Sequence, residues 1–140
     1  MSQENVEIVR RLYGFWQDRD ASAIEDVVHP DAVVDVSRNI FNPGTHRGIE
    51  GFMRFVEQID EMWDDFMVTP EEFVDGGDTI VGTHRISGTG RGSGLETEMR
   101  AYAVFTFREN KLWRLTGGLR SRDEALEVAG TDDAADLDIG

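Results

Sequence analysis

The second half of the chain holds only strand-like segments joined by short turns, and this feature most constrains the fold. Four segments rich in β-branched and aromatic residues run over residues 66–75, 79–87, 95–108 and 111–119, and glycine- or asparagine-containing turns separate them. Such turns join neighbouring antiparallel strands, because a parallel pair needs a crossover of a dozen or more residues. The pattern predicts an antiparallel meander.

Helical spacing dominates the first half of the chain. Apolar residues fall on one side of a helical wheel over residues 5–18, and the same spacing returns over residues 48–62. Asp20 is a candidate N-cap for a short helix that we expect to end at His29, because the residue before a proline avoids helical geometry.

A strand over residues 32–36 and an irregular loop over residues 38–47 complete the first half, and a last helix is expected over residues 122–129. The order of elements is helix, helix, strand, helix, four strands and helix. This order predicts an α+β fold in which helices pack on one face of a strongly curved, mostly antiparallel sheet. A sheet bent in this way leaves a cone-shaped cavity that suits a ligand.

Composition excludes several classes of protein. The 140 residues fit one domain, and the absence of cysteine excludes disulfides and thiol chemistry. The formal net charge of −14 argues against nucleic-acid binding, because the arginines are scattered rather than gathered on one face. Without a membrane-length apolar run or a signal-peptide pattern, we expect a cytoplasmic protein that does not bind membranes. The aspartate-rich residues 131–140 are expected to form a disordered tail after a domain of residues 1–130.

Five sequence stretches in a defined order carry a family resemblance over residues 4–130. They read VEIVRRLYGFW, AIEDVVHPDAVVDV, HRGIEGF, DGGDTIVGTHRISGTGRGSG and AVFTFRENKLWRLTGGLRSRDEALEVAG. Together they resemble the SnoaL-like branch of the NTF2-like superfamily, which includes ketosteroid isomerases, polyketide cyclases and limonene epoxide hydrolases. The resemblance implies an NTF2-like cone, a mostly apolar pocket for a small hydrophobic molecule, no cofactor, and a homodimer formed through the convex face of the sheet.

The resemblance does not carry over the usual catalytic carboxylates. The positions at which related enzymes hold them are occupied in this chain by Val36, Ala103 and Gly117. Strand alternation in the same alignment gives a set of residues that face the cavity, to which two tryptophans are added. The expected lining is Trp16, Val34, Val36, Trp63, Met99, Ala101, Ala103, Phe105, Leu115, Gly117 and Leu119. The opposite, dimer-facing set is Arg100, Tyr102, Val104, Arg114 and Thr116.

Asp35, His84 and Tyr13 are the candidate acid and base groups. An inward imidazole at position 84 would have a pKa suited to proton transfer, and a carboxylate at position 35 would gain proton affinity in an apolar cavity. Alternation with its valine neighbours argues that Asp35 faces outward, and His84 could equally be a structural histidine. Both alternatives stay open at this point.

The remaining motifs point to no further chemistry. His29 is expected to cap a helix end or lie exposed, and His46 lies on a loop near the expected cavity mouth. With His84 they lack the spacing of a metal motif, so no metal is expected. The glycines of the GTGRGSG turn do not match a nucleotide-binding pattern. Two functions remain: a cofactor-independent isomerase, cyclase or hydrolase acting by acid/base chemistry, or a non-enzymatic ligand-binding or dimerisation module.

Overall fold

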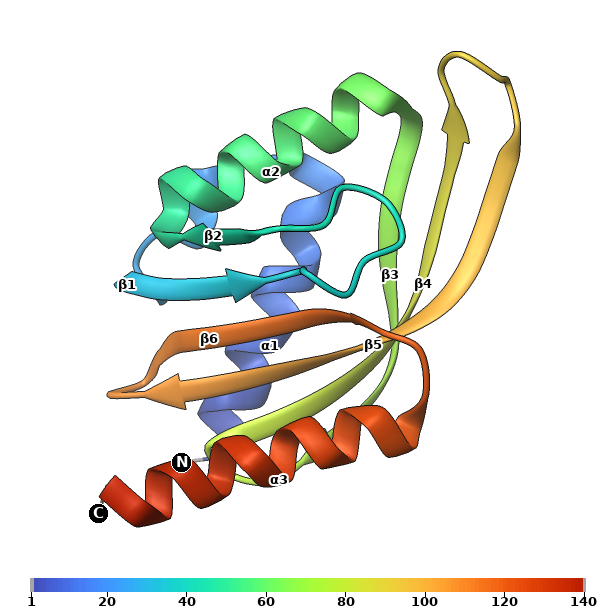
Figure 1. The fold of residues 1–140 in the computed structure, drawn as a ribbon. Coiled ribbons are helices and arrows are strands. Elements are labelled where there is room, and N and C mark those ends of the chain that lie inside the picture. Colours follow the sequence, from blue (N-terminus) through green and yellow to red (C-terminus); the bar gives the residue numbers. More distant parts are fainter. Residues whose placement is uncertain (1, 140) are drawn as a thin grey trace.

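The computed structural model describes the backbone of residues 2–139 and the side chains of residues 3–130. Figure 1 shows its helices and strands. The helical elements are α1 (Ser2–Asp18), the 3₁₀ turn η1 (Ala21–Ala23), α2 (Gly48–Met62) and α3 (Arg122–Ile139). The strands are β1 (Val28–Asp35), β2 (Thr45–Arg47), β3 (Trp63–Asp75), β4 (Thr79–Gly90), β5 (Glu96–Arg108) and β6 (Lys111–Leu119).

The six strands form one open sheet in the order β2-β1-β6-β5-β4-β3. The meander β3 to β6 is antiparallel throughout, as the short turns predict, and β1 joins β6 as the parallel pair. The sheet bends sharply where β4 and β5 cross in Figure 1, so that α1 and α2 enclose its concave side. The α+β prediction is confirmed.

The region between α1 and β1 differs from the predicted short helix. Only a single 3₁₀ turn forms, although Asp20 caps it as expected by accepting a hydrogen bond from the Ser22 backbone N–H. Strand β1 then begins at Val28, upstream of the predicted start, and runs through Pro30. Proline has no backbone N–H to donate. It is tolerated there because the register with β6 shifts between Val28 and Val33, so the ladder requires no hydrogen bond from residue 30.

Strand β2 lies inside the segment expected to be an irregular loop. It pairs with only three residues of β1, with His46 opposite Val34. The chain then turns directly into α2 at Gly48, where φ is +66° and an added Cβ would lie 2.9 Å from the Pro30 carbonyl oxygen. Only glycine fits this left-handed, close approach, and it fixes the start of α2.

Helix α3 packs on the face of the sheet opposite to α1. Its residues Ala125 and Ala129 form one buried cluster with Val81, Val104 and Leu119. The next residues along β5, among them Ala103, Phe105 and Phe107, belong instead to the core shared with α1. The prediction that the helices pack on one face of the sheet therefore holds for α1 and α2, whereas α3 covers the opposite face.

This position of α3 corrects part of the predicted dimer surface. Val104 is fully buried and Thr116 is 3% exposed within one chain. Tyr102 packs at the edge of the same cluster. A second copy therefore has no access to Val104 or Thr116 while α3 lies in this position.

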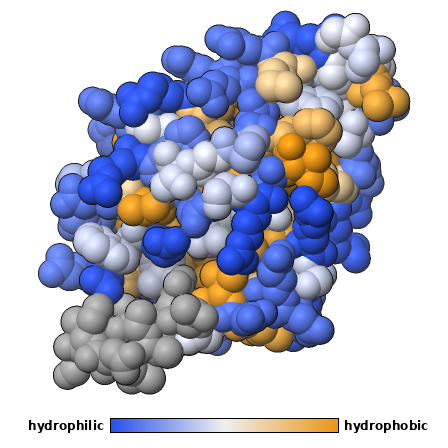
Figure 2. All heavy atoms as spheres, in the orientation of Figure 1, coloured by the Kyte–Doolittle hydropathy of each residue, from blue (hydrophilic) through white to orange (hydrophobic). Residues whose placement is uncertain are grey.

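The predicted acidic tail falls on residues 131–140, whose side chains lie outside the described part of the chain. The backbone of α3 continues to Ile139. Polar side chains cover most of the face seen in Figure 2, as the high content of acidic residues leads one to expect. Among the described residues, no helix combines the length and apolar character needed to cross a membrane.

Candidate functional site

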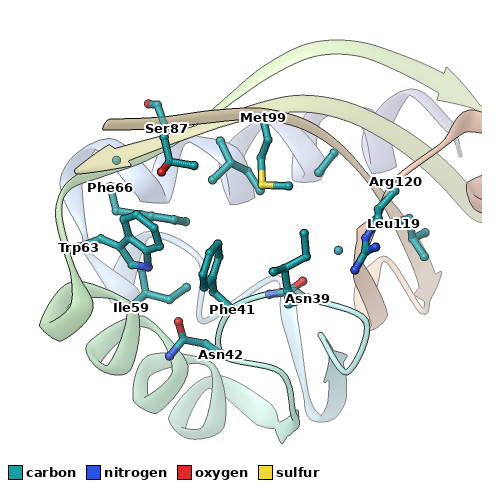
Figure 3. A pocket seen from close by; sticks show the side chains of 16 residues that line it. Asn39, Phe41, Asn42, Ile59, Trp63, Phe66, Ser87, Met99, Leu119 and Arg120 are labelled. Atoms are coloured by element: carbon teal, nitrogen blue, oxygen red, sulfur yellow. The ribbon is translucent and has the colours of Figure 1, made fainter. Parts of the chain in front are cut away.

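Two adjoining cavities lie between the concave face of the sheet and the helices. The deeper one, here called the inner chamber, has a volume of about 120 Å³. The shallower one, here called the outer pocket, has a volume of about 70 Å³ and is shown in Figure 3. Both cavities are lined by Asn39, Ile59, Phe66, Ile86 and Gly118. The remaining lining of the inner chamber is Leu12, Tyr13, Trp16, Ile24, Val28, Val34, Val36, Ile49, Phe52, Phe55, Val68, His84, Leu112, Leu115 and Gly117.

Tyr13 and His84 meet at the wall of the inner chamber. Tyr13 projects from the buried side of α1, and His84 projects from the inward side of β4. The Tyr13 hydroxyl lies 2.7 Å from His84 Nδ1, a strong hydrogen bond between residues 71 positions apart in the chain.

A glycine makes room for this pair. An added Cβ at Gly82 would lie 2.5 Å from the Tyr13 hydroxyl and 3.2 Å from the ring of Phe105. The Tyr13 ring also packs edge-on against Phe105 and is stacked with Phe73. The Tyr13 hydroxyl therefore reaches His84 because residue 82 has no side chain.

Burial keeps both members of the pair neutral. It raises the pKa of Tyr13 well above its usual value of 10.0 and lowers the pKa of His84 from 6.5 to about 4, although the nearby charge of Glu71 opposes the change at His84. At neutral pH the pair is a phenol and a neutral imidazole. The tautomer of His84 depends on whether Nδ1 accepts from or donates to the Tyr13 hydroxyl, and no hydrogen bond to Nε2 is described within residues 3–130.

The residues expected to line the cavity lie in three different places in the structure. Trp16, Val34, Val36, Leu115 and Gly117 lie at the inner chamber, and Trp63, Met99, Ala101 and Leu119 lie at the outer pocket. Ala103 and Phe105 line neither cavity. They are buried in the core beneath Tyr13, because α1 packs directly on that part of β5.

Asp35 lies outside both cavities. Its carboxylate accepts hydrogen bonds from the Ser37 backbone and hydroxyl and lies 3.1 Å from Arg114 Nη2, in a polar cleft beside α3. These partners lower the pKa of Asp35 below its usual value, although burial acts most strongly and in the opposite direction. The structure thus brings Tyr13 and His84 together and leaves Asp35 on the other face, as strand alternation favours.

The other two histidines are also outside the cavities. His29 Nδ1 accepts a hydrogen bond from the Asp31 backbone N–H, and its ring packs edge-on against Trp113. The ring of His46 packs against Phe55 from β2, and its pKa is lowered by burial and by the charge of Arg54. Among residues 3–130, no three His, Asp or Glu side chains are grouped as a metal site.

Comparison with known proteins agrees with this fold. The family model of the SnoaL-like domain matches residues 9–115. The chain belongs to the SnoaL-like family.

Solved structures share the fold at low sequence identity. An NTF2-like protein from Burkholderia thailandensis is 26% identical, with a TM-score of 0.72, and the match covers 79% of this chain and 86% of the other. TerC co-crystallised with polyporic acid is 22% identical, with a TM-score of 0.73 over 89% of this chain and 98% of its own. A SnoaL-like polyketide cyclase from Jannaschia is 19% identical, with a TM-score of 0.71 over 91% and 92%. No protein of curated function matches the sequence.

This SnoaL-like chain has no Asp or Glu among the described residues that line its two cavities. Three residues stand where related enzymes are expected to hold carboxylates. Val36 and Gly117 lie side by side at the inner chamber, and Ala103 is buried in the core. Any acid or base chemistry in the inner chamber therefore depends on Tyr13 and His84.

The sequence did not predict the contribution of α2 to the inner chamber or that of the loop residues to the outer pocket. Phe52, Phe55 and Ile59 of α2 form one wall of the inner chamber, and their helical spacing was the available signal. Asn39 and Arg120 bring polar groups to the outer pocket from loops. No periodicity marks loop residues, so nothing in the sequence pointed to them.

Proposed function

We propose that this SnoaL-like protein binds a small, mostly apolar molecule that carries a hydrogen-bonding oxygen. One observation carries the proposal: the Tyr13–His84 hydrogen bond of 2.7 Å lies at the wall of a chamber whose other lining residues are, apart from Asn39, apolar or glycine. Binding sites of this kind combine apolar walls with a few polar groups that orient the ligand.

The position of the proton in the Tyr13–His84 pair determines which hydrogen-bonding group of a ligand His84 can bind. When the Tyr13 hydroxyl donates to His84 Nδ1, the proton of the neutral imidazole resides on Nε2, which donates to a ligand oxygen. In the opposite tautomer Nε2 accepts instead. A hydroxyl group on the ligand matches both arrangements, and a carbonyl matches the first.

The size of the inner chamber suits a single ring at its base. An engineered apolar cavity of about 150 Å³ binds benzene, and the chamber is close to that at about 120 Å³. A phenol or a cyclic ketone would place its ring against the aromatic wall of Phe52, Phe55 and Phe66, with its oxygen toward His84.

Fluorescence titration with 2-naphthol, compared with naphthalene, tests the proposal. The variant Tyr13→Phe/His84→Leu removes both polar partners while keeping their approximate shape, so neither partner is left unsatisfied. We expect 2-naphthol to bind the double variant about tenfold more weakly than the wild type, and naphthalene to bind both equally. Failure of 2-naphthol to bind the wild type, or equal binding to the variant, would contradict the proposal.

A second candidate is a cofactor-independent isomerase, cyclase or hydrolase that uses His84 as its base. The specific observation in its favour is a neutral imidazole at the wall of the chamber, because in the tautomer whose Nδ1–H donates to the Tyr13 oxygen, Nε2 accepts a proton. Turnover of a β,γ-unsaturated steroid ketone or a small epoxide measures it. The rate should be constant from pH 5 to 8 and fall below about pH 4 as the imidazole is protonated. Unchanged turnover in His84→Gln would exclude this role.

We also propose a cytoplasmic homodimer, formed through the part of the outer sheet face that α3 leaves open. Charged side chains on this open surface neutralise one another, since Glu71 forms ion pairs with both Arg85 and Arg100 at 3.0 Å. Tyr102 lies beside this surface at the edge of the α3 cluster, whereas Arg114 pairs with Asp35 in the cleft beside α3.

A further inference from the structure

The outer pocket contains a cation that lacks a carboxylate partner. Arg120 lines this pocket, and in Figure 3 its side chain extends toward the side of the pocket where Asn39 lies. Seven other arginines are described in ion pairs with Asp or Glu within residues 3–130, whereas no such pair is described for Arg120. Glu124, four residues further along the chain, accepts a hydrogen bond from the Arg120 backbone N–H and lies 4.0 Å from Arg38.

The strand register places Arg120 in one row with His84. Residue 84 of β4 pairs with residue 101 of β5, and residue 102 of β5 pairs with residue 119, the last residue of β6. Extending this register by one residue past the end of β6 puts residue 120 opposite residue 101. Neighbouring strands lie about 4.8 Å apart, which puts the backbones of His84 and Arg120 about 10 Å from each other. Side chains in one row point to the same face of a sheet.

The small residue between these two polar groups keeps the row open. Ala101 lies between them on the sheet and lines the outer pocket, while His84 lines the inner chamber. Met99 and Ile86, which pair with each other, bound the same space on one side. A flat apolar molecule can therefore lie over Ala101 and extend from one cavity into the other.

We propose that the ligand is an elongated, flat molecule of at least two rings with a hydrogen-bonding oxygen at one end and a carboxylate at the other. The oxygen contacts His84 in the inner chamber, and the carboxylate binds Arg120 in the outer pocket. This substrate class rests on the proposed function, because it adds an anionic end to the apolar ligand proposed for the inner chamber.

Charge makes Arg120 the feature that selects such a ligand. The chain carries a formal net charge of −14, which repels anions in general. A guanidinium binds a carboxylate through charge-assisted, often bidentate hydrogen bonds, which are stronger than neutral ones. Arg120 supplies that group at the pocket, with Asn39 as a further hydrogen-bonding side chain beside it.

The test compares 6-hydroxy-2-naphthoic acid with its methyl ester, since the two differ only in the charged end. Binding is followed by fluorescence titration to the wild type, to Arg120→Gln and to a control, Arg122→Gln. Arg122 is an exposed arginine at the start of α3 that lines neither cavity. We expect the acid to bind the wild type and the control about tenfold more tightly than the ester, and Arg120→Gln to remove this preference.

Each other outcome contradicts a defined part of the account. If the ester binds the wild type as tightly as the acid does, the carboxylate inference is wrong while the apolar site stands. The same holds if Arg120→Gln weakens the acid and the ester equally. If neither compound binds the wild type, both the proposed function and this inference fail.

Discussion

At the scale of single residues, the neutral state of His84 has a measurable consequence for stability. Its pKa is lowered from 6.5 to about 4 in the folded protein, so between these values the unfolded chain binds a proton that the folded chain does not. The stability contributed by the neutral imidazole is complete above pH 6.5 and is lost as the pH falls toward 4. The shift corresponds to about 3 kcal/mol.

We expect the free energy of unfolding of the wild type to fall about 3 kcal/mol further than that of His84→Gln between pH 7 and pH 4. Urea unfolding at a series of pH values measures both. Because Asp35 and Glu71 have lowered pKa values and also lose stability in acid, only the difference between the two proteins reports on His84. Parallel curves would show that His84 is not buried as a neutral group.

Gly82 gives a second prediction at this scale. The Cβ of Gly82→Ala would lie 2.5 Å from the Tyr13 hydroxyl, so the tyrosine must move away from His84. We expect a loss of about 1–3 kcal/mol, as for other overpacked cores, measured by thermal unfolding.

Gly14→Ala is the matched control, because its Cβ would meet no atom within 4 Å on the exposed side of α1. That substitution should stabilise the helix by about 0.5–1 kcal/mol. An equal response of the two variants would contradict the close approach of Tyr13 to the sheet.

At the scale of secondary structure elements, helix α3 should be an integral part of the fold. Ala125 is fully buried against the outer face of the sheet, so Ala125→Asp would place a charge in that cluster. We expect a loss of about 3 kcal/mol or more in the free energy of unfolding. Leu126→Asp, at a position that is 43% exposed, should change it little. Similar effects of the two substitutions would mean that α3 does not pack on the sheet.

Much of this element order is readable from the sequence, for physical reasons. The spans of α2 and β6 follow from strong periodicity and from clear turn residues, and both were predicted with their observed bounds. Strand β2 was missed because three residues after a Pro-Gly turn carry no alternation signal. The face on which α3 packs could not be predicted, because helical spacing identifies an apolar side without naming its partner.

Part of the candidate site could likewise be predicted from the sequence, and part could not. Alternation identified Val34 and Val36 as inward-facing and Asp35 as outward-facing. The Tyr13–His84 pair joins residues 71 positions apart, so only the packing of α1 onto β4 defines it. Arg120 lies just beyond residue 119, where the predicted strand and β6 both end, so the set of cavity-facing strand residues did not include it.

At the scale of the whole molecule, the proposed homodimer predicts a mass in solution of twice the 15.8 kDa chain. Light scattering after size-exclusion chromatography at micromolar concentration measures this mass. Arg100→Glu would break the pairing of Arg100 with Glu71 and add two negative units to the outer face, so we expect it to weaken the dimer. A monomer mass for the wild type would contradict the assembly.

The inner chamber, with the Tyr13–His84 pair in its wall, is the central feature of the whole molecule. A crystal structure of the protein with bound 2-naphthol tests it most directly. We expect the hydroxyl-bearing ring within the inner chamber and the hydroxyl oxygen about 2.7–3.2 Å from His84 Nε2. An empty chamber in the presence of saturating 2-naphthol, or a bound ligand whose oxygen points away from His84, would contradict it.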